Sequence, residues 1–228
     1  MATKPTPLYI ISRILKLLGL LLLTSIFGLL FWRVCISTII PREIKRLQVN
    51  DSLVAAYKAH GDKLEMFRQS VPDISREEHN YGYFSVVDYA IIPEASQVQV
   101  IFRYNHSTIE KLAEDFEFSG LPGRDTELFE LSLVKTTAPP ENSEGGADKA
   151  AQNEQRYLAS KVVSSTTLLY NYRRVVFEGV SIGDAAELSL EIHYLGRVDY
   201  VELYNRRDEN TEVKLSGADK RALSTAAE

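Results

Sequence analysis

The stretch Gln97–Tyr104, QVQVIFRY, alternates apolar and polar side chains along most of its length. Its large apolar residues at every second position are Val98, Val100, Phe102 and Tyr104. Because successive side chains of a strand point to opposite faces, these four residues share one face. The pattern therefore predicts a β-strand with one buried face and one solvated face.

The same alternation recurs further along the chain. The predicted inward-facing side chains are Phe129, Leu131 and Leu133 in one stretch, Leu188, Leu190, Ile192 and Tyr194 in a second, and Val198, Tyr200 and Glu202 in a third. Residues 83–92 and 161–180 are rich in β-branched and aromatic residues, and the second of these stretches is long enough for one bent strand or two strands. Turn-forming residues lie between the strands, at 93–96, 119–125, 181–185 and 195–197. The last of these turns predicts a hairpin.

Helical patterns occur in two places. In residues 107–116, Ser107 and Glu110 have the spacing of a capping box, and the helix would bury Ile109, Leu112 and Phe116 on one face. Residues 42–69 also carry apolar side chains at helical spacing, with Asn50 as a candidate N-cap and Gly61 as an interruption. Two interpretations of this segment stay open, a membrane-proximal stalk and two helices packed on the domain.

We therefore predict a mainly β protein, in which six or seven strands and one or two short helices form a β-sandwich-like domain. A two-layer α/β sheet is the alternative. The predicted order is an N-terminal tail (1–16), a transmembrane anchor (17–40), a helical membrane-proximal stalk (41–71), a β-rich globular domain (72–207) with a disordered loop (136–155), and a flexible tail (208–228) with one weak helix around Lys220.

The anchor is predicted from the uncharged run Leu17–Trp32. Sixteen helical residues span about 24 Å, less than the roughly 30 Å hydrocarbon core of a bilayer, so the span must extend into a flank. Extension to Ile40 includes only Arg33, whereas extension towards the N-terminus includes two basic residues. We therefore predict a single-pass signal-anchor over 17–40, closed by Pro41, in preference to a cleaved signal peptide or a mitochondrial signal.

The compartment of the domain depends on weaker signals. The flanking basic residues are Lys4, Arg13 and Lys16 before the span and Arg33, Arg42, Lys45 and Arg46 after it. Three against four gives no orientation by the positive-inside rule. The one cysteine, Cys35, lies in the anchor, so the domain has no disulfide, which favours a reducing compartment.

Two N-x-S/T sequons favour the opposite side of the membrane. They begin at Asn50 and Asn105, and Asn105 is the better glycosylation candidate because it is farther from the anchor. We predict an endomembrane or plasma-membrane protein with a lumenal or extracellular β domain. A mitochondrial inner-membrane location and a cytosolic domain are the alternatives.

The sequence shows no motif for catalysis. None of the four histidines has metal-ligand spacing, and there is no phosphate-binding or dinucleotide-binding glycine pattern. The net charge of −5 and the scattered basic residues give no reason to expect a nucleic-acid partner. We predict no catalytic, metal or cofactor site and no enzymatic activity.

A partner site is predicted from composition. The candidate partner-binding residues are Tyr170, Tyr172, Arg173 and Arg174 in LLYNYRRVVF. Tyrosine and arginine are the types enriched at the centres of protein interfaces. The predicted function is a membrane-anchored, non-enzymatic adaptor or assembly subunit, whose β domain binds a partner protein near the bilayer. The alternative is a tethered domain that binds a lipid or small ligand in an apolar cavity.

Overall fold

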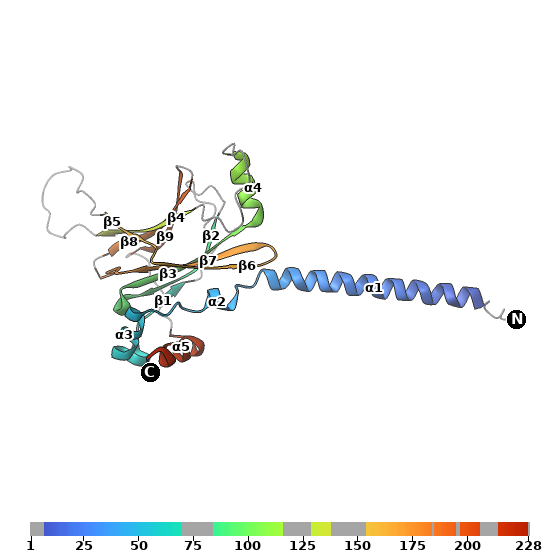
Figure 1. Ribbon diagram of the computed structural model, residues 1–228, viewed down its shortest axis with the longest axis horizontal. Helices are drawn as coiled ribbons and strands as arrows, with labels where there is room; N and C mark the ends of the chain where they lie inside the picture. Colours follow the sequence, from blue (N-terminus) through green and yellow to red (C-terminus); the bar gives the residue numbers. More distant parts are fainter. Residues whose placement is uncertain are drawn as a thin grey trace.

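The computed structural model describes residues 7–69, 84–115, 129–137, 154–183, 185–194, 197–205 and 214–227. A long N-terminal helix projects from a domain built of two antiparallel sheets and a few short helices (Figure 1). The prediction of a mainly β protein, with an apolar helix followed by a β-sandwich-like domain, is confirmed.

The elements have the following bounds. The helices are α1 Pro7–Ser37, α2 Arg42–Lys45, α3 Asp51–His60, α4 His106–Asp115 and α5 Gly217–Ala227, with short 3-10 turns η1 Gly61–Lys63 and η2 Pro93–Ala95. The strands are β1 Phe67–Gln69, β2 Ser85–Ile92, β3 Gln97–Asn105, β4 Glu130–Thr137, β5 Glu154–Leu158, β6 Lys161–Thr166, β7 Tyr170–Glu178, β8 Ala185–Tyr194 and β9 Arg197–Asn205.

Within the described ranges the strands form two sheets. Sheet A has the order β1-β2-β3-β7-β6 and sheet B has the order β5-β4-β8-β9. The stretch 161–180 is two strands, which pair as an antiparallel hairpin. The hairpin predicted at 195–197 is present, since Tyr194 at the end of β8 pairs with Arg197 at the start of β9.

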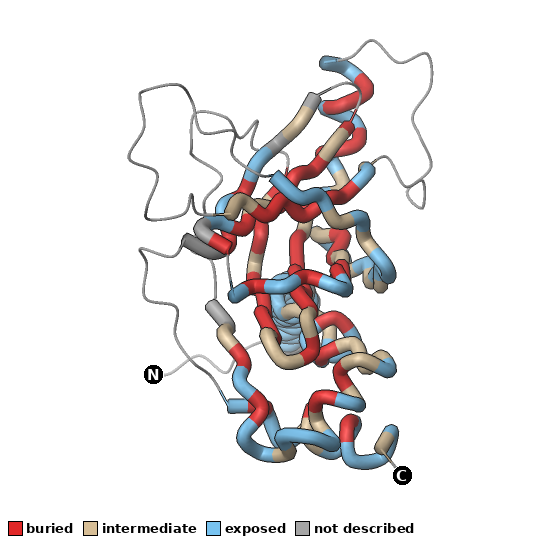
Figure 2. Tube along the Cα trace, turned by 90° about the vertical axis from the view of Figure 1, so that its left-hand side faces the viewer, coloured by how far each residue is buried: buried red, intermediate tan, exposed pale blue. Residues whose placement is uncertain are grey.

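The main core lies between the two sheets, where Figure 2 shows buried residues along the strands of both layers. The inward-facing side chains predicted in β3, β4 and β8 are buried there or pack against it. Around Phe84, aromatic rings pack edge to face at centroid distances of 4.6 Å to Phe129 and 5.3 Å to Tyr194. Such pairs are favourable because the positive ring edge meets the negative ring face.

The face predicted for β9 is wrong. Val201 and Leu203 are buried, whereas Tyr200 is 47% exposed. The pairing of Val201 with Leu190 points Val201 inwards, and a register shift follows at Leu188 and Ser189. Two apolar sets interleave in this stretch, and the pairing with β8 selects the one that reaches the core.

The outer face of sheet A is also covered, so the prediction of a solvated second face for β3 is wrong. Gln97, Gln99 and Ile101 on that face are fully buried. Residues 38–50 and the helices α3 and α5 lie on this side of the sheet (Figure 1). These segments form a third layer on sheet A, so β3 is buried on both of its faces.

The helices of residues 42–63 are packed on the domain, and this is the second of the two interpretations left open. Leu53 on α3 and Leu223 on α5 are fully buried in one cluster with Ile92 of β2. Phe67 belongs to strand β1, not to a helix. The helix predicted around Lys220 is present as α5, and its Leu223 is fully buried, so this part of the predicted flexible tail is packed on the domain.

Caps and boundaries of the helices are partly as predicted. Asn50 caps α3, because its Oδ1 accepts a hydrogen bond from Leu53 N at 3.1 Å, and Gly61 ends the helix at φ 57°. α4 begins at His106, so Ser107 lies inside the first turn and the predicted capping box is wrong. Ile109 and Leu112 of α4 are buried as predicted, while Phe116 lies outside the described residues.

The helix α1 is long and apolar enough to cross a membrane over Ser12–Ile36, at a length of about 37 Å. The helix includes the N-terminal extension that the prediction rejected, and it ends at Ser37, three residues before the predicted end of the anchor at Ile40. Pro41 disfavours helical geometry in the residue before it. Ile40 packs on sheet A instead.

Several predicted features lie outside the described residues. The interior of the predicted loop 136–155 is not described, although its ends form the last residues of β4 and the first of β5. The turn predicted at 119–125 and residues 206–213 of the tail are also outside it. The disorder of the loop therefore stays a prediction.

Candidate functional site at the junction of the anchor helix and sheet A

The chain that follows α1 lies across the outer face of sheet A. Tyr172 Oη on β7 donates a hydrogen bond to Thr38 O at 3.3 Å, just past the end of the helix. Ser165 Oγ on β6 donates to Glu43 Oε1 at 2.7 Å. Ile44 of α2 is fully buried in a cluster with Ile101 and Tyr172. We call residues 38–48 with the strand residues that hold them the junction.

Arg174 is the centre of the junction, with 1% of its surface exposed. Its Nε donates to Ile44 O at 2.6 Å, and its Nη2 donates to Lys45 O at 3.0 Å. Its Nη1 donates to Gln99 Oε1 at 2.5 Å. One buried guanidinium thus joins two carbonyls of the membrane-proximal chain to a side chain of β3, which satisfies polar groups that burial would otherwise leave unpaired.

The side chain of Gln99 also holds Gln48 of the membrane-proximal chain. Its Oε1 accepts from Gln48 N at 2.9 Å, and its Nε2 donates to Gln48 O at 2.9 Å. The side-chain amide therefore pairs with the backbone of Gln48 as a neighbouring strand would. Because the donor and acceptor are both used, residue 48 is held in one register on the sheet.

The helix α5 holds the same segment from the other side. Asp219 Oδ1 accepts from Leu47 N at 3.0 Å, and Asp219 Oδ2 accepts from Ser216 Oγ at 2.6 Å. Ser216 Oγ accepts in turn from Asp219 N at 3.2 Å, the pattern of a capped helix start. Asp219 is 3% exposed. The backbone of residues 44–48 is therefore fixed between sheet A and α5.

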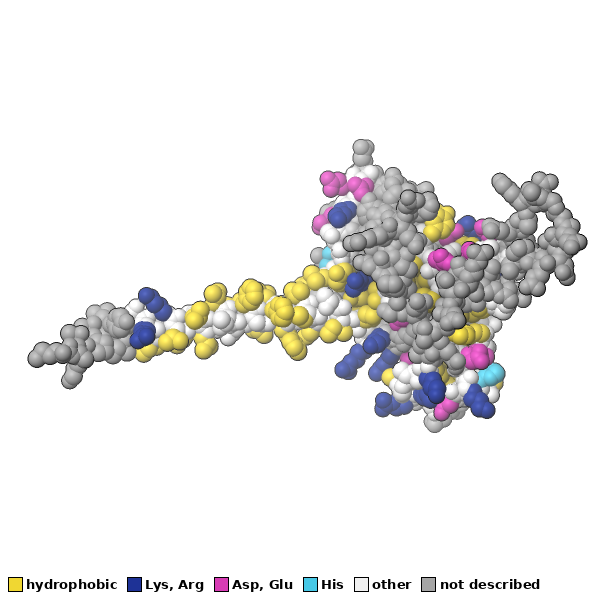
Figure 3. All heavy atoms as spheres, turned by 180° about the vertical axis from the view of Figure 1, so that it is seen from behind, with side chains coloured by type: hydrophobic (Ala, Val, Ile, Leu, Met, Phe, Trp, Pro, Cys, Tyr) yellow, Lys and Arg dark blue, Asp and Glu magenta, His cyan; other side chains and the backbone are white. Residues whose placement is uncertain are grey.

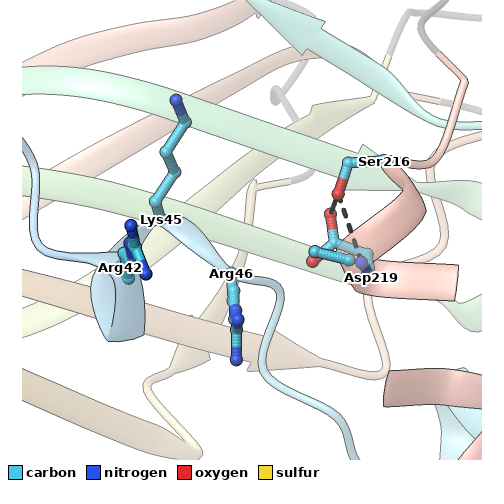
Figure 4. A pocket seen from close by; sticks show the side chains of 6 residues that line it. Arg42, Lys45, Arg46, Ser216 and Asp219 are labelled. Atoms are coloured by element: carbon cyan, nitrogen blue, oxygen red, sulfur yellow. Dashed lines mark hydrogen bonds between the residues drawn. The ribbon is translucent and has the colours of Figure 1, made fainter. Parts of the chain in front are cut away.

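A basic cleft of about 360 Å³ opens beside this segment. Its lining residues are Arg42, Lys45, Arg46, Ser216, Ala218 and Asp219. Figure 4 shows the basic side chains extending in different directions, with the hydrogen-bonded Ser216 and Asp219 across from them. In Figure 3, Lys and Arg side chains gather on the domain beside the end of the apolar helix.

The predicted partner-binding residues do not form one exposed patch. Tyr172 and Arg174 are buried under residues 38–48. Arg173 points to the opposite face of the sheet and donates a hydrogen bond to Tyr104 Oη at 3.2 Å. Tyr170 is partly buried, with the Arg103 guanidinium 4.5 Å from its ring centroid. The expectation of an exposed docking surface is wrong for Tyr172 and Arg174, because residues 38–48 cover them.

A polar cluster on the outer face of sheet B was not predicted. Glu191 Oε2 accepts from Ser132 Oγ at 3.2 Å and from His193 Nε2 at 2.8 Å, and Arg156 Nη1 lies 3.0 Å from the same oxygen. Glu191 and His193 alternate with the buried apolar residues of β8, and this alternation was the available signal for the face that they share.

The geometry of that cluster is not the one that activates a nucleophile. His193 Nε2 lies 3.3 Å from Ser132 Oγ, but the same nitrogen contacts the carboxylate. A serine nucleophile needs one ring nitrogen to take its proton while a carboxylate orients the other. Ser132 and His193 both point to one glutamate oxygen, which describes a hydrogen-bonded ion cluster.

The remaining candidate groups are possible metal ligands, a tyrosine phenol and the two sequon asparagines. Among the residues that the structure covers, no three His, Cys, Asp or Glu side chains are grouped so that they could hold a metal ion. Desolvation raises the pKa of the Tyr157 phenol above its ordinary value of 10.0. Asn50 Nδ2, the atom that a glycan would modify, donates to Glu178 Oε1 at 2.6 Å, whereas Asn105 is exposed at the end of β3.

The described residues define a class, a β-sandwich domain held on the end of a helix that is long and apolar enough to cross a membrane. Comparison of the chain with models of known families, with curated proteins and with solved structures finds no match.

Proposed function

We propose that this chain is a single-pass membrane protein whose α1 anchors a non-enzymatic adaptor or assembly domain, which binds a partner protein close to the bilayer. The observation that carries the proposal is a set of buried and partly buried hydrogen bonds to the backbone of residues 44–48. Arg174 donates to the carbonyls of Ile44 and Lys45, while Gln99 and Asp219 accept from the amides of Gln48 and Leu47. A flexible tether would leave these backbone groups in water. Here they are paired inside the protein, so the first residues after the anchor belong to the domain.

A domain held in this way presents the same face at the same height above the bilayer. Because the junction occupies the outer face of sheet A, we assign the partner to the exposed residues on the outer face of sheet B. A row of paired residues crosses that face, from Leu158 through Ser132 and Glu191 to Tyr200. The two ends of the row, Leu158 and Tyr200, are 67% and 47% exposed, whereas Ser132 and Glu191 between them are buried. An exposed tyrosine on the same sheet face as an arginine is typical of binding surfaces.

The packing between the sheets supports a protein partner over an apolar ligand. Val100 and Val175 of sheet A and Leu133 and Leu190 of sheet B are fully buried in one cluster. These side chains contact one another in the space between the sheets where an apolar ligand would otherwise bind. The sheet B cluster likewise supports a non-enzymatic role, because its serine and histidine share one carboxylate oxygen.

The adaptor proposal is tested with a photo-crosslinking amino acid in the full-length protein in its native membranes. We expect adducts from position 200 on sheet B and none from position 58, where exposed Lys58 on α3 is the matched control. The change Leu158→Ser should reduce the adducts from position 200. Equal adducts from both positions, or none from position 200, would overturn the assignment of the partner face. Release of the protein by alkaline carbonate would overturn the anchor itself.

The proposal includes a location, with the β domain on the lumenal or extracellular side of an endomembrane or the plasma membrane. Support comes from the sequon residue Asn105, which is exposed at the end of β3. Glycosidase treatment should raise the gel mobility of the wild-type protein and not of N105Q. An intact protein without any such shift, and with protease-accessible β strands in sealed vesicles of cytosolic orientation, would place the domain in the cytosol.

A further inference from the structure

We infer that the tip of the β6–β7 hairpin, Leu168 and Leu169, inserts into the bilayer that α1 crosses, and that Arg42, Lys45 and Arg46 bind the anionic headgroups of that bilayer. The inference rests on the anchor in the proposed function and is independent of the partner protein. It goes with the cytosolic alternative for the domain, because the cytoplasmic leaflet carries the anionic lipids. Use of the sequon at Asn105, which pairs with Tyr170 beside the tip, would count against it. The insertion gives the domain a second membrane contact in addition to its covalent link to the helix.

The two leucines are exposed where local structure does not require them. Leu168 is 50% exposed and Leu169 is 37% exposed, at the turn between β6 and β7. Tight turns favour Gly, Asn, Asp, Pro and Ser, because those residues supply the backbone angles or the local hydrogen bonds of the turn. Leucine supplies neither. An adjacent pair of exposed leucines at a turn therefore indicates contact with an apolar environment.

The tip is held rigidly by polar groups on either side of the leucines. Thr167 N donates to Tyr170 O at 2.8 Å, and Thr167 Oγ1 accepts from Tyr170 N at 3.2 Å. Thr166 Oγ1 donates to Asn171 Oδ1 at 2.9 Å, and His106 Nε2 lies 2.9 Å from Thr167 O. The hydrogen bonds that form the turn thus come from its threonines and neighbours. A tip held in place before binding loses little conformational entropy when it inserts.

The position of the tip identifies the bilayer as the apolar environment that the two leucines contact. Along β7, Arg174 contacts Ile44 and Lys45, and Tyr172 contacts Thr38 at the end of α1, so the strand approaches the helix as it approaches the tip. Strand β7 begins at Tyr170, about 6–7 Å beyond Tyr172 in that direction at about 3.3 Å per residue, and Leu169 directly precedes it. Figure 1 shows the turned end of β6–β7 beside the end of α1. The tip therefore lies beside the membrane-proximal end of the domain, next to the end of the apolar helix.

Positive charge lies at the same end of the domain. The cleft residues Arg42, Lys45 and Arg46 follow Ser37, the last residue of α1, by five to nine positions. In the described part of the chain none of the three makes an ion pair, whereas Lys220 pairs with Asp62 and Arg156 with Glu191. Basic residues next to a membrane span attract anionic lipid headgroups, by about fivefold in partition per residue.

The carboxylates near these basic residues are engaged elsewhere. Asp219, which also lines the cleft, accepts hydrogen bonds from Leu47 N and Ser216 Oγ with its two oxygens. Glu43 on α2 accepts from Ser165 Oγ. The basic side chains spread outwards in Figure 4, which suits several headgroups of a lipid surface better than one small anion.

The insertion is tested with the full-length protein reconstituted in phosphatidylcholine vesicles that contain phosphatidylserine. In a Cys35→Ser background, an environment-sensitive fluorophore is attached to L169C, to L158C as the exposed control on sheet B, and to L21C as the reporter of the anchor. We expect blue-shifted emission and quenching by nitroxide-labelled lipid at positions 169 and 21, and water-like emission at position 158.

The outcomes separate the two proposals. Quenching at 21 with water-like emission at 169 would overturn the insertion and leave the anchor intact. Water-like emission at 21 would overturn the anchor. A blue shift at 169 without quenching by lipid nitroxide would mean a protein contact and would also overturn the insertion.

The headgroup contact is tested in the same vesicles with and without phosphatidylserine. The variant with Arg42, Lys45 and Arg46 changed to Gln should lose the increase in quenching at position 169 that phosphatidylserine produces in the unchanged chain. The matched control changes Lys58 and Lys63, which lie on α3 and η1 and not in the cleft, to Gln. An equal loss in both variants, or an unchanged phosphatidylserine dependence in the first, would overturn the assignment of these three residues.

Discussion

Replacing Arg174 with methionine should detach the membrane-proximal chain from sheet A. The substitution keeps an apolar side chain of similar reach and removes three hydrogen bonds, to Ile44 O, Lys45 O and Gln99 Oε1. A hydrogen bond from a charged donor contributes about 1.5–3 kcal/mol, and the desolvation of the buried guanidinium offsets part of the sum. Since three acceptors then stay buried without this donor, we expect R174M to lower the free energy of unfolding by about 3–5 kcal/mol.

The assay is thermal unfolding of the full-length protein in detergent micelles, followed by near-ultraviolet circular dichroism. For a chain of this size, about 2–4 °C per kcal/mol gives a fall in Tm of roughly 6–20 °C. Hydrogen exchange should also accelerate at the amides of residues 44–48. The matched control is R173M, because Arg173 is only partly buried and donates one hydrogen bond, to Tyr104 Oη.

For R173M we expect a loss of about 1 kcal/mol and no change in exchange at residues 44–48. If R174M is no less stable than R173M, or if its exchange in the junction equals that of wild type, the junction does not hold the domain as described. The support for the proposed function would then be lost as well.

Three further changes test separate contacts. Y172F removes the hydrogen bond to Thr38 O and should cost about 1 kcal/mol in unfolding free energy, so an unchanged denaturation midpoint would argue against that contact. D219A leaves the buried Leu47 N without its acceptor and should cost about 2 kcal/mol, with faster hydrogen exchange at that amide as the readout; protection equal to wild type would contradict the contact. L223A truncates a fully buried side chain of α5 and should cost about 2–5 kcal/mol, and limited proteolysis should then cut residues 214–227 faster than in wild type, a result that identical digestion would refute.

Features that depend on neighbours along the chain could be predicted from the sequence. The alternation of Val98, Val100 and Phe102 predicts an inward face of β3 because the period of a strand is two residues, and those side chains are in the core. The apolar run after Lys16 likewise predicts the long helix α1. Asn50 was recognisable as a cap because its partner, Leu53 N, is three residues away.

Which strands are covered on their second face depends on tertiary packing. Arg174 and Ile44 are 130 positions apart, so no local pattern shows that the guanidinium serves the chain beside the anchor and not a partner protein. The inward face of β9 followed from its pairing with Leu190, because two interleaved apolar sets fit the same strand. The helix at Lys220 was visible in the sequence, but its packing against Leu53 was not. In each case the physical reason is the same: burial of a face depends on which distant segment packs against it, and a residue's own neighbours do not encode that choice.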